Sequence, residues 1–522
     1  MPFIFHREKS GTMDGLRIQP GARAMTKTSP ALFVQVRRDK EKPLFRQIAD
    51  QIRNHVTGGV LPVGSRLPGV RSLAGTLSVS EDTVSQAYAT LLEEAVIEAR
   101  PRSGYFIAKK LALTGSTPHP SVYQKFPAGM PARNALMIEE ARRFFERTRS
   151  GEPVLELLRG APALEGVEQK QWIAEAARFA RSPWLQQTGA QSPGDLRLRR
   201  IIAARLRELR GIACEAESIV VTTGMRQSLA VALQLVLTQG EAVLLESPSA
   251  PEVSAQLFAR GLRAVWGRVD GQGLVFDADE ARKAGCRCAI VSDASQMPLS
   301  IAMARSRKKE MLIWARTSGA VIIENDEGAL LSRADPPEMP LRAAPFGEEC
   351  VVYCGGFDQI VPPACAIAFL IAPKGLEQAF VGAAMLSGSV PPLSEQRTLA
   401  AFLGSEAFDG HLRRVRALAR QRSSILQEML GAVSEEIGRL QRAENGTLAC
   451  FVLEPEHARL EKQLAKSLSL TPVSILPLAR FAQGPDAVAG LVFNFLAGSE
   501  SEFLETAGAL VSALQNCGGQ AV

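Results

Sequence analysis

A cluster of small polar side chains opens the helix expected over residues 80–95, and side chains of this kind donate hydrogen bonds to phosphates or base edges. The cluster consists of Ser80, Thr83, Ser85 and Gln86. Glu81 and Asp82 stand among them and would face a polyanion with like charge. The turn therefore has the chemistry of a nucleic-acid contact, although its two acidic side chains would repel the phosphates.

Positive charge for such a contact must come from outside this helix, because residues 80–98 contain no lysine or arginine. Residues 31–110 carry 12 Lys and Arg against 8 Asp and Glu, a net +4. A mild excess of this size is compatible with a nucleic-acid partner and does not require one. The candidate cations are Arg66, Arg71, Arg100, Arg102, Lys109 and Lys110.

The elements around the polar turn form a compact pattern. Apolar residues at four-residue spacing predict an amphipathic helix over 43–59, and a shorter helix follows over 70–78. The third helix covers 80–95, with Ser80 as a plausible N-cap. Residues 96–110 then alternate like two strands around a turn at 102–104. Three helices and a hairpin are the winged helix-turn-helix order.

This region resembles the GntR-type winged helix over about 70 residues. The matching segments are "PLFRQIADQI", "GSRLPGVRSLAGTLSVSEDTV", "AYATLL" and "ARPRSGYFI". The resemblance implies DNA contacts by Arg71, Ser80 and Thr83, and a wing glycine at Gly104. The family usually has a basic residue where this chain has Glu81, so an unusual affinity or sequence preference is expected.

A second candidate site lies in "TTGMRQ", where two threonines and a glycine precede an expected helix. Amides at a helix N-terminus bind anions, because they lack partners within the helix and the helix dipole favours negative charge. The groups that could receive an anion here belong to Thr223, Gly224, Met225 and Arg226.

The rest of the chain alternates helices with short apolar strands, a pattern that predicts an α/β fold with a mostly parallel sheet between helices. The strands are expected in "SIVVTT", "AVLLES", "CAIVSD", "AVIIEN", "CVVYCGG" and "AIAFLIAP". We predict a disordered N-terminus over 1–30, the winged helix over 31–110 and a linker over 111–154. The body follows over 155–522, with a small C-terminal α+β subdomain from about 411.

A GntR-type head on such a body resembles the MocR subfamily, whose body is similar to a fold-type I aminotransferase. "LLESPSAPE", "SDASQMPLSIAM", "IIENDEGALL", "GGFDQIVPP" and "HLRRVR" follow "TTGMRQ" in the order of that family. The resemblance implies a homodimer and pyridoxal phosphate as the family cofactor. The cofactor needs a lysine for its aldehyde, a carboxylate at the pyridine nitrogen and an aromatic ring for stacking.

The residues that correspond to these groups have changed in this chain. Gln359 occupies the position of the lysine, and Asn325 the position of the carboxylate. The tyrosine two residues beyond that carboxylate corresponds to Glu327, the stacking tyrosine to Ala250, and an arginine beyond the lysine to Ala366. Glu324 and Asp326 flank Asn325, but on a strand they point to the opposite face. We therefore expect no catalytic residue and no covalent cofactor.

Four functions remain open. The first is a sequence-specific DNA-binding regulator whose body is a non-catalytic sensor or dimerisation platform with a possible small-molecule effector. The second is a regulator that binds pyridoxal phosphate without a covalent bond, through Thr223–Arg226. The third is an active aminotransferase with a dispensable head. The fourth is a protein-interaction module that has lost both DNA binding and cofactor binding.

Composition favours an intracellular protein, and the GntR resemblance implies double-stranded DNA as its partner. The eight cysteines show no zinc spacing, so reduced thiols and no metal site are expected. No apolar run reaches the ~18 residues of a membrane helix. We expect a cytoplasmic, nucleoid-associated bacterial protein with no membrane contact.

Overall fold

A computed structural model describes the fold of the chain in two units, Met1–Gly129 and Met130–Val522. The described residues are 43–57, 65–77, 79–94, 96–100, 104–108, 141, 164, 166–181, 193–331, 338–361, 365–388, 390–431, 433, 437–441, 446–469, 471–482 and 488–518. The predictions for the N-terminal 30 residues, for Arg102, Lys109 and Lys110, and for nearly all of the linker lie outside them.

The first unit is the predicted winged helix-turn-helix. Its elements are α1 (Leu44–Thr57), α2 (Val70–Leu77), α3 (Glu81–Glu93) and the antiparallel strands β1 (Ile97–Arg100) and β2 (Gly104–Ile107). Buried apolar side chains of the three helices and the hairpin form one core, which includes Ile48, Ile52, Val84, Tyr88 and Leu91. The expected order of helices and strands is confirmed.

The start of α3 is fixed by its cap. Ser80 Oγ accepts a hydrogen bond from the backbone amide of Thr83 at 3.2 Å, which satisfies a donor that the helix itself leaves unpaired. Glu81 and Asp82 lie in the first turn, where negative charge complements the helix dipole. The two acidic residues therefore have a structural reason to be there, and the N-cap prediction for Ser80 is confirmed.

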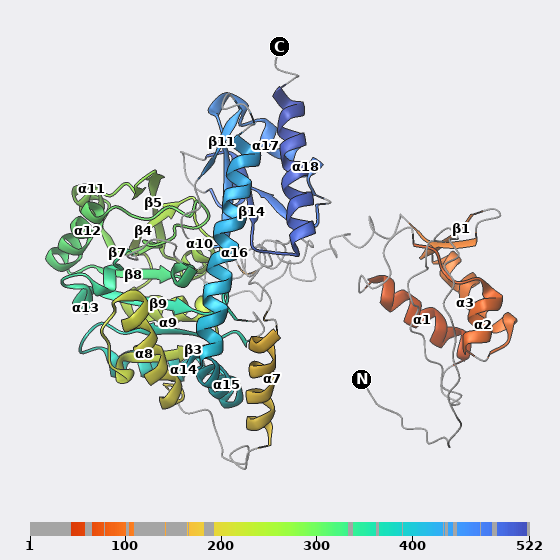
Figure 1. The fold of residues 1–522 in the computed structure, drawn as a ribbon, viewed down its shortest axis with the longest axis horizontal. Helices are drawn as coiled ribbons and strands as arrows, with labels where there is room; N and C mark the ends of the chain where they lie inside the picture. The colour runs from red at the N-terminus through yellow and green to blue at the C-terminus, as the bar shows by residue number, and fades with distance from the viewer. Residues whose placement is uncertain are drawn as a thin grey trace, which may run out of the picture. The chain divides into compact units, whose positions relative to one another are not determined.

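The second unit is built on an eight-stranded sheet of order β3-β10-β9-β8-β7-β4-β5-β6 (Figure 1). Its inner pairings β9-β8, β8-β7, β7-β4 and β4-β5 are parallel, while β10 and β6 pair antiparallel. The strands are β3 (Ile219–Thr222), β4 (Ala242–Ser247), β5 (Arg263–Asp270), β6 (Gly273–Leu274), β7 (Cys286–Val291), β8 (Val321–Asp326), β9 (Val351–Gly356) and β10 (Ala368–Ile371). The mostly parallel sheet is confirmed; β5, which has the alternating sequence "RAVWGRVD", was not among the expected strands.

Helices cover both faces of this sheet, and successive strand residues divide between two apolar layers. Val243 and Leu245 of β4 join the core that contains α9, whereas Leu244 packs in the layer with Trp314 of α12. The helices are α7 (Gly166–Ala180), α8 (Leu196–Arg210), α9 (Met225–Val236), α10 (Pro251–Ala259), α11 (Ala278–Lys283), α12 (Arg305–Ser318), α13 (Gly347–Cys350), α14 (Glu377–Leu386) and α15 (Leu393–Leu403). Burial on both faces explains why these strands read as apolar runs.

A smaller α+β subdomain ends the body, as predicted. The long helix α16 (Glu406–Gly431) leads into an antiparallel sheet of order β11-β12-β14-β13 (Figure 1). Its remaining elements are β11 (Gly438–Gln441), β12 (Leu448–Leu453), α17 (Leu460–Ser467), β13 (Ile475–Pro477), β14 (Gly490–Asn494) and α18 (Glu500–Gly518). Among the described helices, none is both long and apolar enough to cross a bilayer.

Candidate nucleic-acid interface and candidate ligand pocket

The polar turn at the start of α3 is exposed on the first unit. Ser80, Ser85 and Gln86 are exposed and Thr83 is half-buried, while Val84 and its apolar neighbours face the core. Ser80 Oγ lies 2.8 Å from Thr83 Oγ1, so these two hydroxyls also bond to each other. The geometry leaves all four side chains accessible, and their contact with DNA stays a prediction.

Arg71 and Glu81 form an ion pair that the sequence did not reveal. Arg71 Nε lies 3.7 Å from Glu81 Oε1, and the side chains are 92% and 61% exposed. An exposed pair of this kind contributes ~0–1 kcal/mol and weakens as salt rises. Glu81 thus partly neutralises the arginine that the GntR resemblance places at the DNA.

The second basic group lies beside the hairpin. The backbone of residues 65–67 pairs with β2, since Leu67 N donates to Tyr105 O and Ile107 N donates to Ser65 O. This pairing brings Arg66 next to Gly104, where a Cβ would lie 3.7 Å from the guanidinium nitrogens. Gly104 has a φ of +95°, which suits glycine at the end of the turn. Arg66 and Gly104 are therefore neighbours in space, although 38 residues separate them in sequence.

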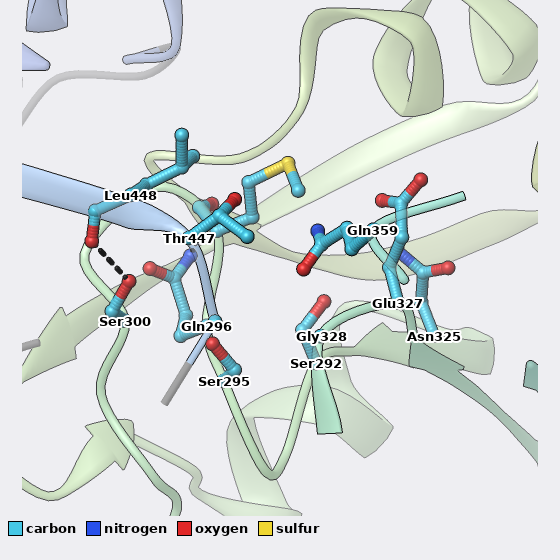
Figure 2. A pocket seen from close by; sticks show the side chains of 12 residues that line it. Ser292, Ser295, Gln296, Ser300, Asn325, Glu327, Gly328, Gln359, Thr447 and Leu448 are labelled. Atoms are coloured by element: carbon cyan, nitrogen blue, oxygen red, sulfur yellow. Dashed lines mark hydrogen bonds between the residues drawn. The ribbon is translucent and has the colours of Figure 1, made fainter. Parts of the chain in front are cut away.

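In the body, three of the predicted site residues line one small cavity at the carboxyl ends of neighbouring strands (Figure 2). Asn325 comes from the end of β8, Glu327 follows it, and Gln359 follows β9. Residues after β7, after β8 and at the start of β12 complete the wall; they are Ser292, Ser295, Gln296, Met297, Ser300, Gly328, Gly446, Thr447 and Leu448. The carboxyl edge of an open parallel sheet is the usual place for a ligand site.

The cavity is closed by close contact between the large and small parts of the body. A Cβ on Gly446 would lie 2.8 Å from Ser295 Oγ, and one on Gly328 would lie 3.2 Å from the Cα of Gly446. Ser300 Oγ donates to the carbonyl of Leu448 at 2.9 Å across the same junction (Figure 2). The remaining volume is about 10 Å³, the size needed for one water molecule.

Two buried polar atoms in the wall of this cavity have no hydrogen-bond partner among the described residues. They are Gln359 Oε1 and Thr447 Oγ1, whose residues are 4% and 1% exposed. Figure 2 shows the Gln359 amide directed toward Thr447. One bound water could donate to both atoms, since buried polar groups are costly without partners.

The carboxylates beside Asn325 turn away from the cavity. Glu324 accepts hydrogen bonds from the amides of Leu341 at 3.0 Å and Arg342 at 2.8 Å. Asp326 pairs with Arg210 at 3.0 Å. This confirms that Glu324 and Asp326 point to the opposite face from Asn325, so neither can replace the carboxylate that Asn325 lacks.

Electrostatics in this region are dominated by burial. Desolvation raises the pKa of Glu324 well above its usual range, and the nearby Asp293 carboxylate adds to the effect. Burial also raises the pKa of Asp326, although Arg210 opposes it. On β4, burial raises the pKa of Glu246 to about 8, while the amide of Ser292 donates to that carboxylate at 3.1 Å. These groups serve the fold and lie outside the cavity wall.

The predicted anion loop begins α9, apart from the cavity at Gln359. Gly224 is the N-cap of α9 with a φ of +90°, and the first turn holds no acidic residue. Thr223 is exposed, and its hydroxyl bonds to the side chain of Gln227. Thr223, Met225 and Arg226 are not among the described residues that line the cavity at Gln359, and their role in one site with Gln359 stays a prediction.

The remaining two predicted positions also lie outside that wall. Ala366, with a φ of +43°, is exposed, and its carbonyl lies 4.0 Å from where a Cβ on Gly224 would be. Ala250 is buried as the N-cap of α10.

The sequence did not predict the polar wall residues that follow β7 or precede β12. Gln296 binds three backbone groups, at Pro248, Met297 and Leu299, and so holds the loop after β7 in place. The run "SDASQMPLS" directly after a strand was the available signal for it. Gly446 and Thr447 had no local signal, because the contact joins positions about 90 residues from Gln359.

Comparisons with known proteins agree with this two-part organisation. Residues 44–107 match the family described as "Bacterial regulatory proteins, gntR family". The body is similar to the crystal structure of LysN, an α-aminoadipate aminotransferase from Thermus thermophilus, with a TM-score of 0.64 and 22% identity over 73% of this chain and 98% of that one. The protein therefore combines a gntR-type helix-turn-helix with an aminotransferase-fold body, the class of a DNA-binding transcriptional regulator.

Two regulators resemble the chain over both parts. One is the HTH-type pyridoxine biosynthesis transcriptional regulator PdxR of Corynebacterium glutamicum, 28% identical over 87% of this chain and 92% of that protein. The other is the probable rhizopine catabolism regulatory protein MocR of Rhizobium meliloti, 28% identical over 74% of this chain and 77% of its own length. The predicted resemblance to MocR-type regulators is confirmed.

Proposed function

We propose that the protein regulates transcription by binding double-stranded DNA, with a body that serves as a non-catalytic sensor and dimerisation platform. The observation that carries the non-catalytic role is the cavity at the sheet edge. Its wall contains Gln359 and Asn325 and, among the described lining residues, no lysine or arginine. An amide nitrogen cannot form an imine with an aldehyde, and a neutral amide cannot balance a pyridinium charge. The residues present therefore do not fit covalently held pyridoxal phosphate.

DNA binding in this proposal uses the start of α3 and the arginines beside it. The first turn of a recognition helix lies in the major groove, and a dimer matches two half-sites on one duplex. Homodimerisation through the body is part of the proposal, as is a place of action at the chromosome in the cytoplasm.

One experiment tests both halves of this function. Purified protein is mixed with pyridoxal phosphate, reduced with borohydride and mapped for cofactor–lysine adducts, and the same preparation is titrated with genomic DNA fragments. We expect specific DNA complexes and no adduct at a lysine of the body. A stoichiometric adduct in unmodified protein would contradict the non-catalytic body, and absence of any specific fragment would contradict the regulator.

A second candidate is a regulator that binds pyridoxal phosphate, or a related phosphorylated molecule, without a covalent bond. The N-terminus of α9 favours it, because the first turn carries no acidic residue and Thr223 is exposed. Equilibrium dialysis with pyridoxal phosphate, repeated with Thr223→Glu, distinguishes this candidate. Retention that the substitution abolishes would support it.

A further inference from the structure

A second cavity lies in the body between α12 and the segment 338–346. It shares no wall residue with the cavity at Gln359. Its volume is about 490 Å³, within the ~300–1,000 Å³ range of small-molecule sites. The apolar side chains in its wall are Leu312, Ile313, Met339, Ala344, Pro345 and Phe346. Ile313, Met339 and Phe346 are 41%, 53% and 40% exposed, so the wall presents apolar surface to solvent. Contiguous apolar surface on a folded protein commonly marks a binding site.

The basic side chains in the wall are Arg305, Lys308 and Lys309 of α12, and they differ in what they already bind. Lys308 is buried, with its ammonium 2.7 Å from Asp293 Oδ2 and 2.8 Å from the carbonyl of Met339. Arg305 is exposed, and its Nε lies 3.5 Å from Glu338.

Lys309 is exposed and has no ion-pair or hydrogen-bond partner within the described part of the chain. Among the described residues, the rim therefore offers one cation without a partner, Lys309, and one weakly paired cation, Arg305, beside the apolar cavity. This arrangement favours a ligand with one negative group.

Phe346 gives an independent reason to expect a ligand. Its φ is +71°, a left-handed conformation that costs a bulky residue ~1–3 kcal/mol. The close approach of Gly347 to the carbonyl of Leu341 explains the tight turn, but glycine or asparagine would suit this turn better than phenylalanine. The ring is only partly buried, and the guanidinium of Arg316 lies 4.0 Å from its centroid. The strain places an aromatic face in the wall of the cavity.

We propose that this cavity binds an amphipathic carboxylate of small-molecule size. Its apolar body lies against Ile313 and Phe346, and its anionic group meets Lys309 and Arg305. Charge-assisted hydrogen bonds to the carboxylate fix its orientation, while burial of the apolar body supplies most of the affinity. The site does not depend on the cofactor position at Gln359.

The test is calorimetric titration of the full chain with decanoate below its micellar concentration, compared with decan-1-ol and decylammonium. We expect saturable one-to-one binding of decanoate and much weaker binding of the two analogues. Equal binding of the alcohol would overturn the anionic part of the proposal, and absence of saturable decanoate binding would overturn all of it.

Two variants in the cavity wall and one control variant on α11 locate the site. Lys309→Glu should weaken decanoate binding about tenfold or more, since one charge-assisted contact is replaced by repulsion. Lys283→Glu makes the same charge change on an exposed residue of α11 and should leave binding unchanged. Ala344→Trp should fill the cavity and abolish binding while the melting temperature and DNA binding are kept. Equal effects of the two lysine variants, or full binding by Ala344→Trp, would place the ligand elsewhere.

Discussion

The start of α3 and the carboxyl edge of the body sheet are both polar, but the polar groups are exposed at the first and buried at the second. Ser80, Ser85 and Gln86 are exposed at the start of one helix, where Ser80 Oγ bonds to both the amide and the hydroxyl of Thr83. At the sheet edge, Gln359 Oε1 and Thr447 Oγ1 are buried with no hydrogen-bond partner among the described residues, in a cavity whose wall comes from four segments of the chain.

A contact surface built from one helix takes its polar groups from neighbouring residues, whereas a cofactor site needs several distant groups at once. Under the proposed function, replacement of the lysine and of the carboxylate by Gln359 and Asn325 would remove the chemistry although the fold persists.

The largest effect is expected when the missing cofactor groups are restored. Gln359→Lys should permit at most weak reductive labelling by pyridoxal phosphate, because a buried lysine without its partners has a lowered pKa and the cavity is small. Adding Asn325→Asp and Ala250→Tyr should raise the labelling by a non-additive amount, since all three act on one bound molecule. Mass spectrometry after borohydride measures the labelled fraction.

Ala250 is buried, so the tyrosine should also lower the melting temperature through overpacking. The unmodified chain is the control and should stay unlabelled. If the single and triple variants label equally, the alignment of Asn325 and Ala250 with the cofactor site is wrong.

A pH-dependent effect on stability should arise from Glu246. Burial raises its pKa to about 8 in the folded chain, above its value when unfolded. Its contribution to stability is therefore present at low pH and is lost as pH rises through 8. Glu246→Gln should reduce the fall in the free energy of unfolding between about pH 5 and pH 8 by ~2–4 kcal/mol.

Urea denaturation at both pH values measures this difference. Glu456→Gln alters an exposed carboxylate of the same body and should leave the slope unchanged. An identical slope in the two variants would show that Glu246 is ionised in the fold.

On the DNA side, Arg71→Ala should weaken specific binding by ~1–3 kcal/mol, as expected for a guanidinium that contacts a phosphate or base. Its present partner Glu81 is exposed, so the arginine can turn to DNA at little cost. Titration at moderate salt measures the affinity. Arg46→Ala removes an exposed arginine from α1 as the control. Equal losses of affinity in both variants would show that Arg71 contributes only general positive charge and makes no specific DNA contact.

The smallest effect is expected for Glu81→Arg. The change removes a repelled carboxylate and also releases Arg71 from its ion pair, so DNA affinity should rise by ~0.5–1.5 kcal/mol at low salt. The gain should shrink as salt rises. Glu93→Arg makes the same charge change at the far end of α3. A weaker complex for Glu81→Arg would indicate that Glu81 accepts a hydrogen bond from a cytosine amine.

Much of the fold was predictable, because its signals are local. The spacing of apolar residues located α1 and α3, and Ser80 marked the start of α3 as an N-cap. The candidate pocket was predictable only in part. Asn325, Glu327 and Gln359 follow strands that the sequence makes visible, and the structure places them in one cavity. Thr223–Arg226 were expected to join them, but the N-terminus of α9 does not line that cavity.

Three features are properties of neighbouring residues and follow from the amino-acid order alone. They are the gntR-type head, the alternating strands of the body and the glutamine in place of a lysine at position 359. Tertiary structure decided three other features. Glu81 meets Arg71 across the turn between two helices, and Thr447 faces Gln359 across the junction of the body's two parts. The third feature is the apolar cavity beside α12, whose wall contains both Ile313 and Phe346. Such contacts depend on how distant segments pack, and no periodicity along the chain encodes them.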